Sequence, residues 1–198
     1  MASYQIDPLV SDALYIERTL NGDDEAFRSL VEKYQDLVFS VVLRIVRNRN
    51  DAEEVAQDSF VKAYQKLSTY NGGSKFSTWL YSIAFNTAIS RTRKKQMETQ
   101  EIEDIGDTLE IATSNQEQLN SLSHDEQKKY LDEALSNMSE QDASVLSLYY
   151  LEEQSVEEVS EITGLSRSNV KVKLHRSRQR LQIEMERLLK GEARTLIE

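Results

Sequence analysis

Few residues in this sequence interrupt a helix. The chain has 198 residues but only one proline and six glycines, the residue types on which hairpins and tight turns most depend. Apolar residues make up 39% of the chain, which is enough for packed cores. Along several segments they recur at every third or fourth position, a spacing that places them on one face of a helix. The sequence therefore predicts an all-α fold.

The first part of the chain predicts a short helix followed by a long one. The dipeptide Asp7-Pro8 has the form of an N-cap and a first helical residue, and Asn21-Gly22 should end this helix. A second helix should start at once, with Asp23 or Asp24 as its cap. Its buried stripe is predicted to be Phe27, Leu30, Val31, Tyr34, Leu37, Val38, Val41, Val42 and Ile45.

A third and a fourth helix should be separated by the loop STYNGGSK. Asp51 should cap the third helix, because Glu54 follows three residues later. Its inward face is predicted to be Val55, Ala56, Ser59, Ala63 and Leu67, with Phe60 and Val61 on the outer face. Ser77 should cap the fourth helix. Trp79 should lie in the core, and the helix should end in the basic residues Arg91, Arg93, Lys94 and Lys95.

One stretch of the chain carries nearly all of the net charge of -10. Residues 1–95 contain 13 Lys or Arg against 12 Asp or Glu, and residues 128–198 contain 11 against 13. Residues 96–127 contain nine acidic residues, no Lys or Arg, and little apolar periodicity. That composition is typical of a flexible linker. We therefore predict two small helical domains, 1–95 and 129–198, joined by a flexible acidic linker at 96–128.

Helical periodicity returns at Lys129 and continues through Met138, and a second helix capped by Ser139 should follow. The next segment has the layout of a helix-turn-helix, which is two short helices joined by a turn containing glycine. Its signals are a capping box of Ser155 and Glu158, Gly164 after the first helix, and Ser166 as the cap of the second.

The second helix of this motif predicts a basic outer face. At about 100° per residue, Val170, Leu174 and Leu181 share one side and should pack inward. The opposite side is formed by Ser168, Lys171, Val172, His175, Arg176 and Gln179, flanked by Arg167, Lys173, Arg178 and Arg180. A basic helix face is often merely solvated. After a helix-turn-helix turn, however, it fits the DNA major groove, where Val172 can meet a thymine methyl and Lys or Arg a guanine edge.

Several classes of function are disfavoured by what the sequence lacks. Without cysteine there are no disulfides or thiolate zinc sites, and two histidines cannot alone build a metal site, so we expect no cofactor and no metal. No carboxylate pair, phosphate loop or nucleophile-base spacing indicates an enzyme. No apolar run approaches the roughly 18 residues of a membrane span, and the start MASYQIDPLVSD does not resemble a secretory signal. We therefore expect a cytoplasmic protein with no stable membrane insertion.

Two stretches on either side of the acidic linker resemble the extracytoplasmic-function (ECF) sigma factors, which direct bacterial RNA polymerase to promoters. The stretch from GDDEAFRSLV to VKAYQKL, continued by KFSTWLYSIAFNTAISRTRKK, resembles sigma region 2. The stretch from ALSNMSEQDA to LHRSRQRL resembles region 4. Their order, their spacing and the linker between them agree with the family.

The resemblance implies three binding surfaces. The -35 element would be bound by Arg167, Ser168, Asn169, Lys171, Val172, Lys173, His175, Arg176 and Arg178. The -10 element, opened to capture an unstacked base, would be bound by Tyr70, Asn71, Lys75, Phe76, Ser77, Asn86, Arg91, Arg93 and Lys94, with Lys95 beside them. The clamp helices of the polymerase beta-prime subunit would be contacted by Asp51, Glu54, Gln57, Asp58 and Phe60.

The resemblance also implies partners. Region 4 would contact the flap of the beta subunit, an anti-sigma factor would mask one or both domains, and the free protein is expected to be a monomer. Ser90 and Phe85 depart from the residues that are common in the family at these positions. The charge of the linker would either mimic RNA in the polymerase exit path or keep the free protein soluble, and we favour the second role.

Two other functions fit parts of the sequence. A dimeric helix-turn-helix repressor would bind a palindromic site as a stable homodimer. A helical adaptor whose basic helix meets an acidic protein would show little salt-dependent affinity for DNA. A sigma factor should instead bind promoters weakly when free and tightly as part of the polymerase holoenzyme.

Overall fold

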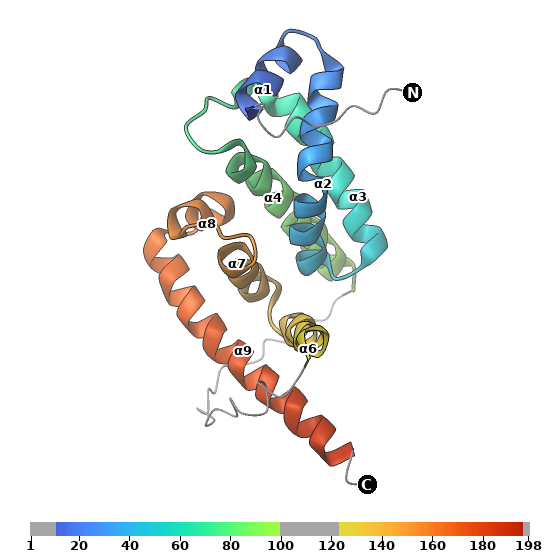
Figure 1. Cartoon of the computed structure of the whole chain (residues 1–198), viewed down its shortest axis with the longest axis vertical. Helices are drawn as coiled ribbons and strands as arrows, with labels where there is room; N and C mark the ends of the chain where they lie inside the picture. The colour runs from blue at the N-terminus through green and yellow to red at the C-terminus, as the bar shows by residue number, and fades with distance from the viewer. Residues whose placement is uncertain (1–10, 100–122, 196–198) are drawn as a thin grey trace. The chain divides into compact units, whose positions relative to one another are not determined.

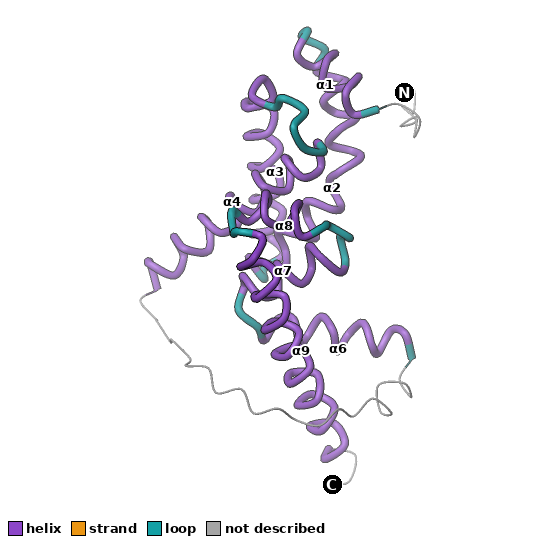
Figure 2. Tube along the Cα trace, turned by 90° about the vertical axis from the view of Figure 1, so that its left-hand side faces the viewer, coloured by secondary structure: helices purple, strands orange, loops and turns teal. Residues whose placement is uncertain are grey.

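The computed structural model of the chain describes residues 11–99 and 123–195, and all regular structure in these ranges is helical (Figures 1 and 2). Contacts group α1 to α4 in one compact unit, and α6, α7, α9 and the first part of α8 in another. The all-α prediction is confirmed. The expected cap at Asp7-Pro8 and most of the expected linker lie outside the described residues.

The N-terminal unit is built around a long central helix. It contains α1 (Asp12–Leu20), α2 (Asp24–Val46), α3 (Arg49–Lys66), a short 3-10 helix (Leu67–Thr69) and α4 (Phe76–Thr99). Helix α2 packs against both α1 and α3, and the three can be followed at the top of Figure 1. Most of the predicted stripe of α2 is buried, whereas Leu37 is exposed and Val31 is half-buried.

The helix boundaries confirm one predicted cap and correct two others. Asp23 caps α2, because its side chain accepts a hydrogen bond from the Ala26 amide. Asp51 does not cap α3: α2 ends at Arg47 in the left-handed conformation, and Asn48 then accepts from the Asp51 amide at 3.0 Å. Ser77 does not cap α4 either, since it already lies within the helix.

Two aromatic side chains lie elsewhere than expected. Phe60 was predicted on the outer face of α3, but it is only 9% exposed. It follows Ala56 by four residues and precedes Ala63 by three, so it shares their buried face. Its neighbour Val61 is 55% exposed, as expected. Trp79, predicted to be a core residue, is half-buried.

The C-terminal unit contains α6 (His124–Asn137), α7 (Glu140–Tyr150), α9 (Arg167–Thr195) and the first part of α8 (Val156–Thr163). Helix α9 packs on both α6 and α7. The Ser139 cap of α7 is confirmed. Helix α6 starts before the expected Lys129, because Ser123 and Glu126 form a capping box that the sequence analysis did not recognise.

A buried carboxylate ties α7 to α9. The side chain of Asp142 is 3% exposed and lies 3.0 Å from the Lys173 ammonium, and the Arg180 guanidinium donates to its other oxygen. Lys173 and Arg180 are seven residues apart, so both reach the carboxylate from one side of α9. Burial alone would raise the pKa of Asp142, but hydrogen bonds from Lys173 and Ser139 and the charge of Lys173 outweigh it, so the pKa is lowered.

Replacing Asn48 should test the corrected start of α3. Asn48→Ala removes the side-chain acceptor of the Asp51 amide and should lower the free energy of unfolding by about 1 kcal/mol, the usual cost of a lost N-cap. Asn50→Ala makes the same change two residues further on, at an exposed helical position, and should cost nothing. Urea denaturation of the two variants measures both effects. Equal stability of Asn48→Ala and wild type would contradict the assigned cap.

The Asp142 interaction predicts a pH-dependent contribution to stability. Its pKa is below 3.8 in the folded state, so the stabilisation is present above that pH and is lost as pH falls through the folded-state value. At pH 7, Asp142→Asn should lower the free energy of unfolding by about 2 kcal/mol, less than for a fully buried pair because both cations are partly exposed.

Urea unfolding followed by NMR signals of α7 and α9 can measure this effect at several pH values. The gap between wild type and Asp142→Asn should shrink as the solution is acidified below pH 3.8. Glu133→Gln, at an exposed acid of α6, provides the control with the same type of change. A gap that stays constant down to full protonation would contradict the interaction.

Candidate nucleic-acid interface

The helix-turn-helix has the local geometry that the sequence predicts. Ser155 and Glu158 exchange capping hydrogen bonds at the start of α8. Gly164 follows α8 with a φ of 72°, a conformation that other residues adopt only with strain. Ser166 then accepts from the Asn169 amide and caps α9. Each predicted turn signal is therefore confirmed.

Burial of one side of α9 leaves its opposite side exposed. Val170 and Leu174 are buried, as predicted, whereas Leu181 is half-buried. The exposed residues in the first turns are Arg167, Ser168, Asn169, Lys171, Val172, His175, Arg176 and Arg178. Val172 is 50% exposed between two lysines. This side of α9 has the chemistry of a major-groove reader.

Lys173 differs from its neighbours on α9. It was predicted to lie with the DNA-contacting residues, but its ammonium is engaged by the buried Asp142 carboxylate and its side chain is 25% exposed. The sequence pattern could not show this, because the partner lies 31 residues earlier in the chain. The structure thus assigns Lys173 to the packing of α7 against α9.

The loop before α4 is anchored by an aromatic cluster. The centroid of the Phe76 ring lies 5.6 Å from that of Tyr70 and 5.7 Å from that of Tyr34. The ring centroids of Tyr70 and Trp79 are 5.5 Å apart. Phe76 is only 3% exposed, so it does not line an open surface as expected. Tyr70 is half-buried, and its hydroxyl donates to the Ser74 carbonyl. Phe76 therefore supports Tyr70, which stays partly accessible.

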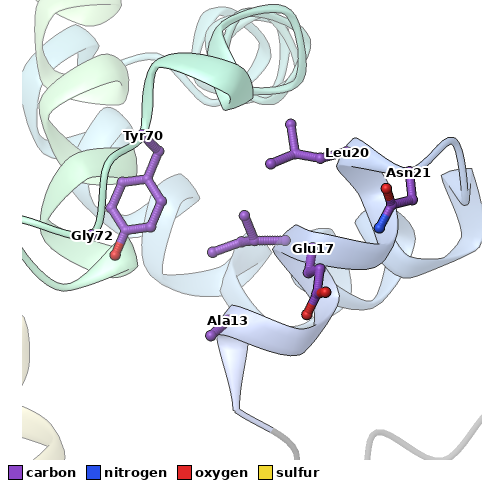
Figure 3. A pocket seen from close by; sticks show the side chains of 7 residues that line it. Ala13, Glu17, Leu20, Asn21, Tyr70 and Gly72 are labelled. Atoms are coloured by element: carbon purple, nitrogen blue, oxygen red, sulfur yellow. The ribbon is translucent and has the colours of Figure 1, made fainter.

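A pocket lies between this loop and α1 (Figure 3). Its volume is about 440 Å³. Tyr70 and Gly72 of the loop face α1 across it, and the opposite side is lined by Ala13, Ile16, Glu17 and Leu20 of α1 and by Asn21, which follows α1. None of the residues on the α1 side was predicted to be functional, because their pattern in the sequence indicates no more than a short helix. Among the residues predicted to bind the -10 element, Tyr70 lines this pocket.

The other residues predicted to bind the -10 element are spread over the loop and α4. Asn71, Lys75 and Asn86 are exposed, and Ser77 is half-buried. The Asn71 side chain accepts from the Gly73 amide at 3.0 Å, and the Asn86 amide group donates to the Ser82 carbonyl. Both side chains keep polar atoms at the surface, where a nucleic acid can reach them.

Acidic residues of α3 pair with basic residues of α4. The Arg91 guanidinium lies 2.8 Å from a Glu54 oxygen and 3.6 Å from an Asp51 oxygen, and the Lys95 ammonium lies 3.0 Å from the other Asp51 oxygen. The predicted polymerase and DNA residues therefore meet here. Gln57 and Asp58, also predicted to contact polymerase, are exposed on α3.

Within the ranges 11–99 and 123–195, no group of three or more His, Asp or Glu side chains is placed to hold a metal ion. None of the helices in these ranges is both long enough and apolar enough to cross a membrane.

Two protein families match the two helical units. Residues 30–98 match the family described as Sigma-70 region 2, and residues 128–181 match Sigma-70, region 4. The first match includes α3 and nearly all of α4, and the second includes the helix-turn-helix.

Two curated relatives match along most of their length. The ECF RNA polymerase sigma-E factor of Haemophilus influenzae is 31% identical over 190 residues, covering 91% of this chain and 98% of the relative. The ECF RNA polymerase sigma factor SigW of Bacillus subtilis is 28% identical over 176 residues, covering 86% and 94%.

Two solved structures share the fold. The sigma factor RpoE of Bartonella quintana, in complex with the anti-sigma factor NepR, matches with a TM-score of 0.63 and 23% identity, covering 81% of this chain and 96% of that chain. CnrH, in complex with the cytosolic domain of CnrY, matches with a TM-score of 0.57 and 18% identity, covering 91% and 97%. With the family matches on both units and a close relative along nearly the whole length, the chain belongs to the ECF RNA polymerase sigma factors and carries sigma-70 regions 2 and 4.

Proposed function

We propose that the exposed side of α9 reads the -35 element while the N-terminal unit binds polymerase and the opened -10 element. The observation that carries this assignment is the burial of Val170 and Leu174, which turns the polar and basic side of α9 to solvent. The protein performs no bond chemistry in this proposal. It supplies binding energy and selectivity, and the polymerase supplies catalysis.

At the -35 element, α9 would lie in the major groove. Lys171 and Arg176 are exposed next to Val172, so a guanine edge and a thymine methyl can be contacted from adjacent positions. Arg167 at the first turn and Arg178 further along would hold phosphates on either side, which gives affinity without sequence information. Ser168, Asn169 and His175 complete the exposed surface. Lys173 is not included among the residues proposed to contact DNA, because it forms an ion pair with Asp142.

At the -10 element, the loop before α4 would hold an unstacked base. Tyr70 is the partly accessible ring of the aromatic cluster and can stack on a base, with Phe76 behind it. Asn71, Lys75 and Asn86 offer exposed polar groups for the base edge and the backbone, and Ser77 lies near them in sequence. Arg93 and Lys94, in the C-terminal part of α4, would hold phosphates.

The exposed side of α3 would contact the beta-prime clamp helices. Glu54, Gln57 and Asp58 are exposed on it, and Asp51 lies one turn before Glu54. Because Phe60 is buried, the exposed Val61 becomes the candidate for an apolar anchor on this helix. Region 4 would contact the flap of the beta subunit.

Further partners follow from the relatives. RpoE of Bartonella quintana and CnrH were solved with protein partners, the first of which is named as an anti-sigma factor. We infer that an anti-sigma factor also binds this chain, and that the free protein is a cytoplasmic monomer. Domain limits at 1–95 and 129–198, joined by 96–128, remain part of the proposal.

In vitro transcription tests the whole assignment. Genomic fragments are transcribed by core polymerase with and without this protein, and start sites that appear only with it are footprinted. A sigma factor should protect two unlike hexamers as a monomer on polymerase. A single palindromic footprint from a homodimer would instead support a repressor, and the absence of new start sites would overturn the proposal.

Arg176 provides a residue-level test of the -35 contact. Arg176→Ala should weaken binding of the holoenzyme to its promoter by about tenfold or more and relax selectivity at one or two base pairs, because a bidentate contact to guanine is worth about 1 to 3 kcal/mol. Gel shifts on a promoter and on single-base variants of its -35 element measure both effects.

Arg187→Ala is the matched control, since Arg187 is an exposed arginine on the same helix that pairs with Glu184. Its promoter affinity should equal that of wild type. If the two variants behave alike, the exposed side of α9 near Arg176 is not the reading surface.

A further inference from the structure

Four charged side chains join α3 to α4 in a set of ion pairs that we call the latch: Asp51, Glu54, Arg91 and Lys95. Arg91 bridges both acids, at 2.8 Å from Glu54 and 3.6 Å from Asp51, while Lys95 pairs with Asp51 at 3.0 Å. Hydrogen bonding by Lys95 lowers the pKa of Asp51, so this acid is ionised across the physiological range. The four charges thus neutralise one another on the surface.

The basic residues in the C-terminal part of α4 fall into two groups, those that the latch pairs with α3 and those that it leaves exposed. Arg93 and Lys94 are exposed and form no ion pair with other described residues, whereas Arg91 and Lys95 are held by α3. On the other side, Gln57 and Asp58 are exposed, whereas Asp51 and Glu54 are engaged by α4. Each of the two proposed binding surfaces therefore has part of its charge occupied by the other.

We propose that the latch couples polymerase binding to DNA binding within the N-terminal unit. This inference rests on the proposed function, in which α3 contacts polymerase and the end of α4 contacts DNA. When polymerase groups take over the carboxylates of Asp51 and Glu54, the guanidinium of Arg91 becomes available to phosphates. The reverse holds equally, because coupling between two binding events is reciprocal.

The size of the coupling follows from the exposure of the pairs. The side chains of Arg91 and Glu54 are 40% and 56% exposed, and an exposed ion pair changes an equilibrium by about two- to fivefold at most. Salt screens it further. The latch therefore contributes one part of the difference between free and polymerase-bound affinity for DNA, and the remainder comes from other contacts.

The first experiment opens the latch from the acidic side. Fluorescence anisotropy measures binding of the free protein to a labelled single-stranded oligonucleotide that carries the -10 segment of a promoter mapped by transcription. Glu54→Gln should bind it about two- to fivefold more tightly than Glu53→Gln. The neighbouring Glu53 is exposed and pairs with Arg49 within α3. Each of the two variants removes one negative charge, so they change the net charge equally.

The salt dependence gives a second readout of the same variants. One released cation should make the slope of log affinity against log salt steeper by about 0.7 in Glu54→Gln, the value for one phosphate contact on a single strand. A mere gain of net charge would change Glu53→Gln to the same extent.

The second experiment opens the latch from the basic side. Without DNA, Arg91→Gln should bind core polymerase about two- to fivefold more tightly than Arg28→Gln, because no pair with Glu54 has to be broken. Arg28 is an exposed arginine that pairs with Glu25 on α2 and provides the matched control. If Arg91 contacted DNA and had no influence on α3, Arg91→Gln would bind core polymerase with the same affinity as Arg28→Gln.

The outcomes separate the two levels of the proposal. If wild type on core polymerase binds the oligonucleotide no better than the free protein, the proposed function fails. If it does bind better, but Glu54→Gln equals Glu53→Gln and Arg91→Gln equals Arg28→Gln, the latch is wrong and the proposed function stands. Thermal unfolding midpoints within a few degrees of wild type establish that each variant is folded.

Discussion

Burial of one apolar stripe on each helix is the constraint on which the surfaces of this protein depend. In α9, Val170 and Leu174 face inward, so the basic side of the helix is exposed. In α3, burial of Val55 and Ala63 leaves Glu54 and Asp58 outside. The hydrophobic cores therefore do more than stabilise the helices, because they determine which charges a partner can reach.

Ion pairs then determine which of the charged side chains at the surface are available to a partner. A net charge of -10 is compatible with DNA binding because basic residues gather in the C-terminal part of α4 and along α9. Not all of them are equally available. Lys173 and Arg180 are committed to Asp142, and Arg91 is paired with Glu54, whereas Arg176 and Lys94 are exposed. As a sigma factor, the protein binds polymerase as well as promoter elements. The ion pairs reduce the number of charges that are available on the proposed polymerase-binding and DNA-binding surfaces.

Most of the fold could be predicted from local patterns. Caps at Asp23, Ser139, Ser155 and Ser166 depend on residues within three positions of one another, and the structure confirms all four. The predicted caps at Asp51 and Ser77 were wrong because Asn48 caps α3 and because α4 already begins at Phe76. Helix ends are the part of a helix that sequence patterns place least well.

The candidate site was less predictable because it depends on contacts between distant segments. Phe76 is buried against Tyr34 from α2, and the partly exposed Lys173 pairs with the buried Asp142 from α7, and the spacing of the sequence reveals neither contact. For Phe60 the helical periodicity was available, since it shares a face with Ala56 and Ala63, so its burial could have been predicted from the spacing.

One measurement tests the central claim most directly: the promoter affinity of the purified chain, determined in a single gel-shift series with and without core polymerase. If two small helical units must act together on polymerase, the free chain should bind promoter DNA weakly and the complex should bind it tightly. The gel shift of the complex should require both the -35 and the -10 element in the DNA. Equal affinity in the two conditions would show that the chain recognises DNA by itself, and the account would be wrong.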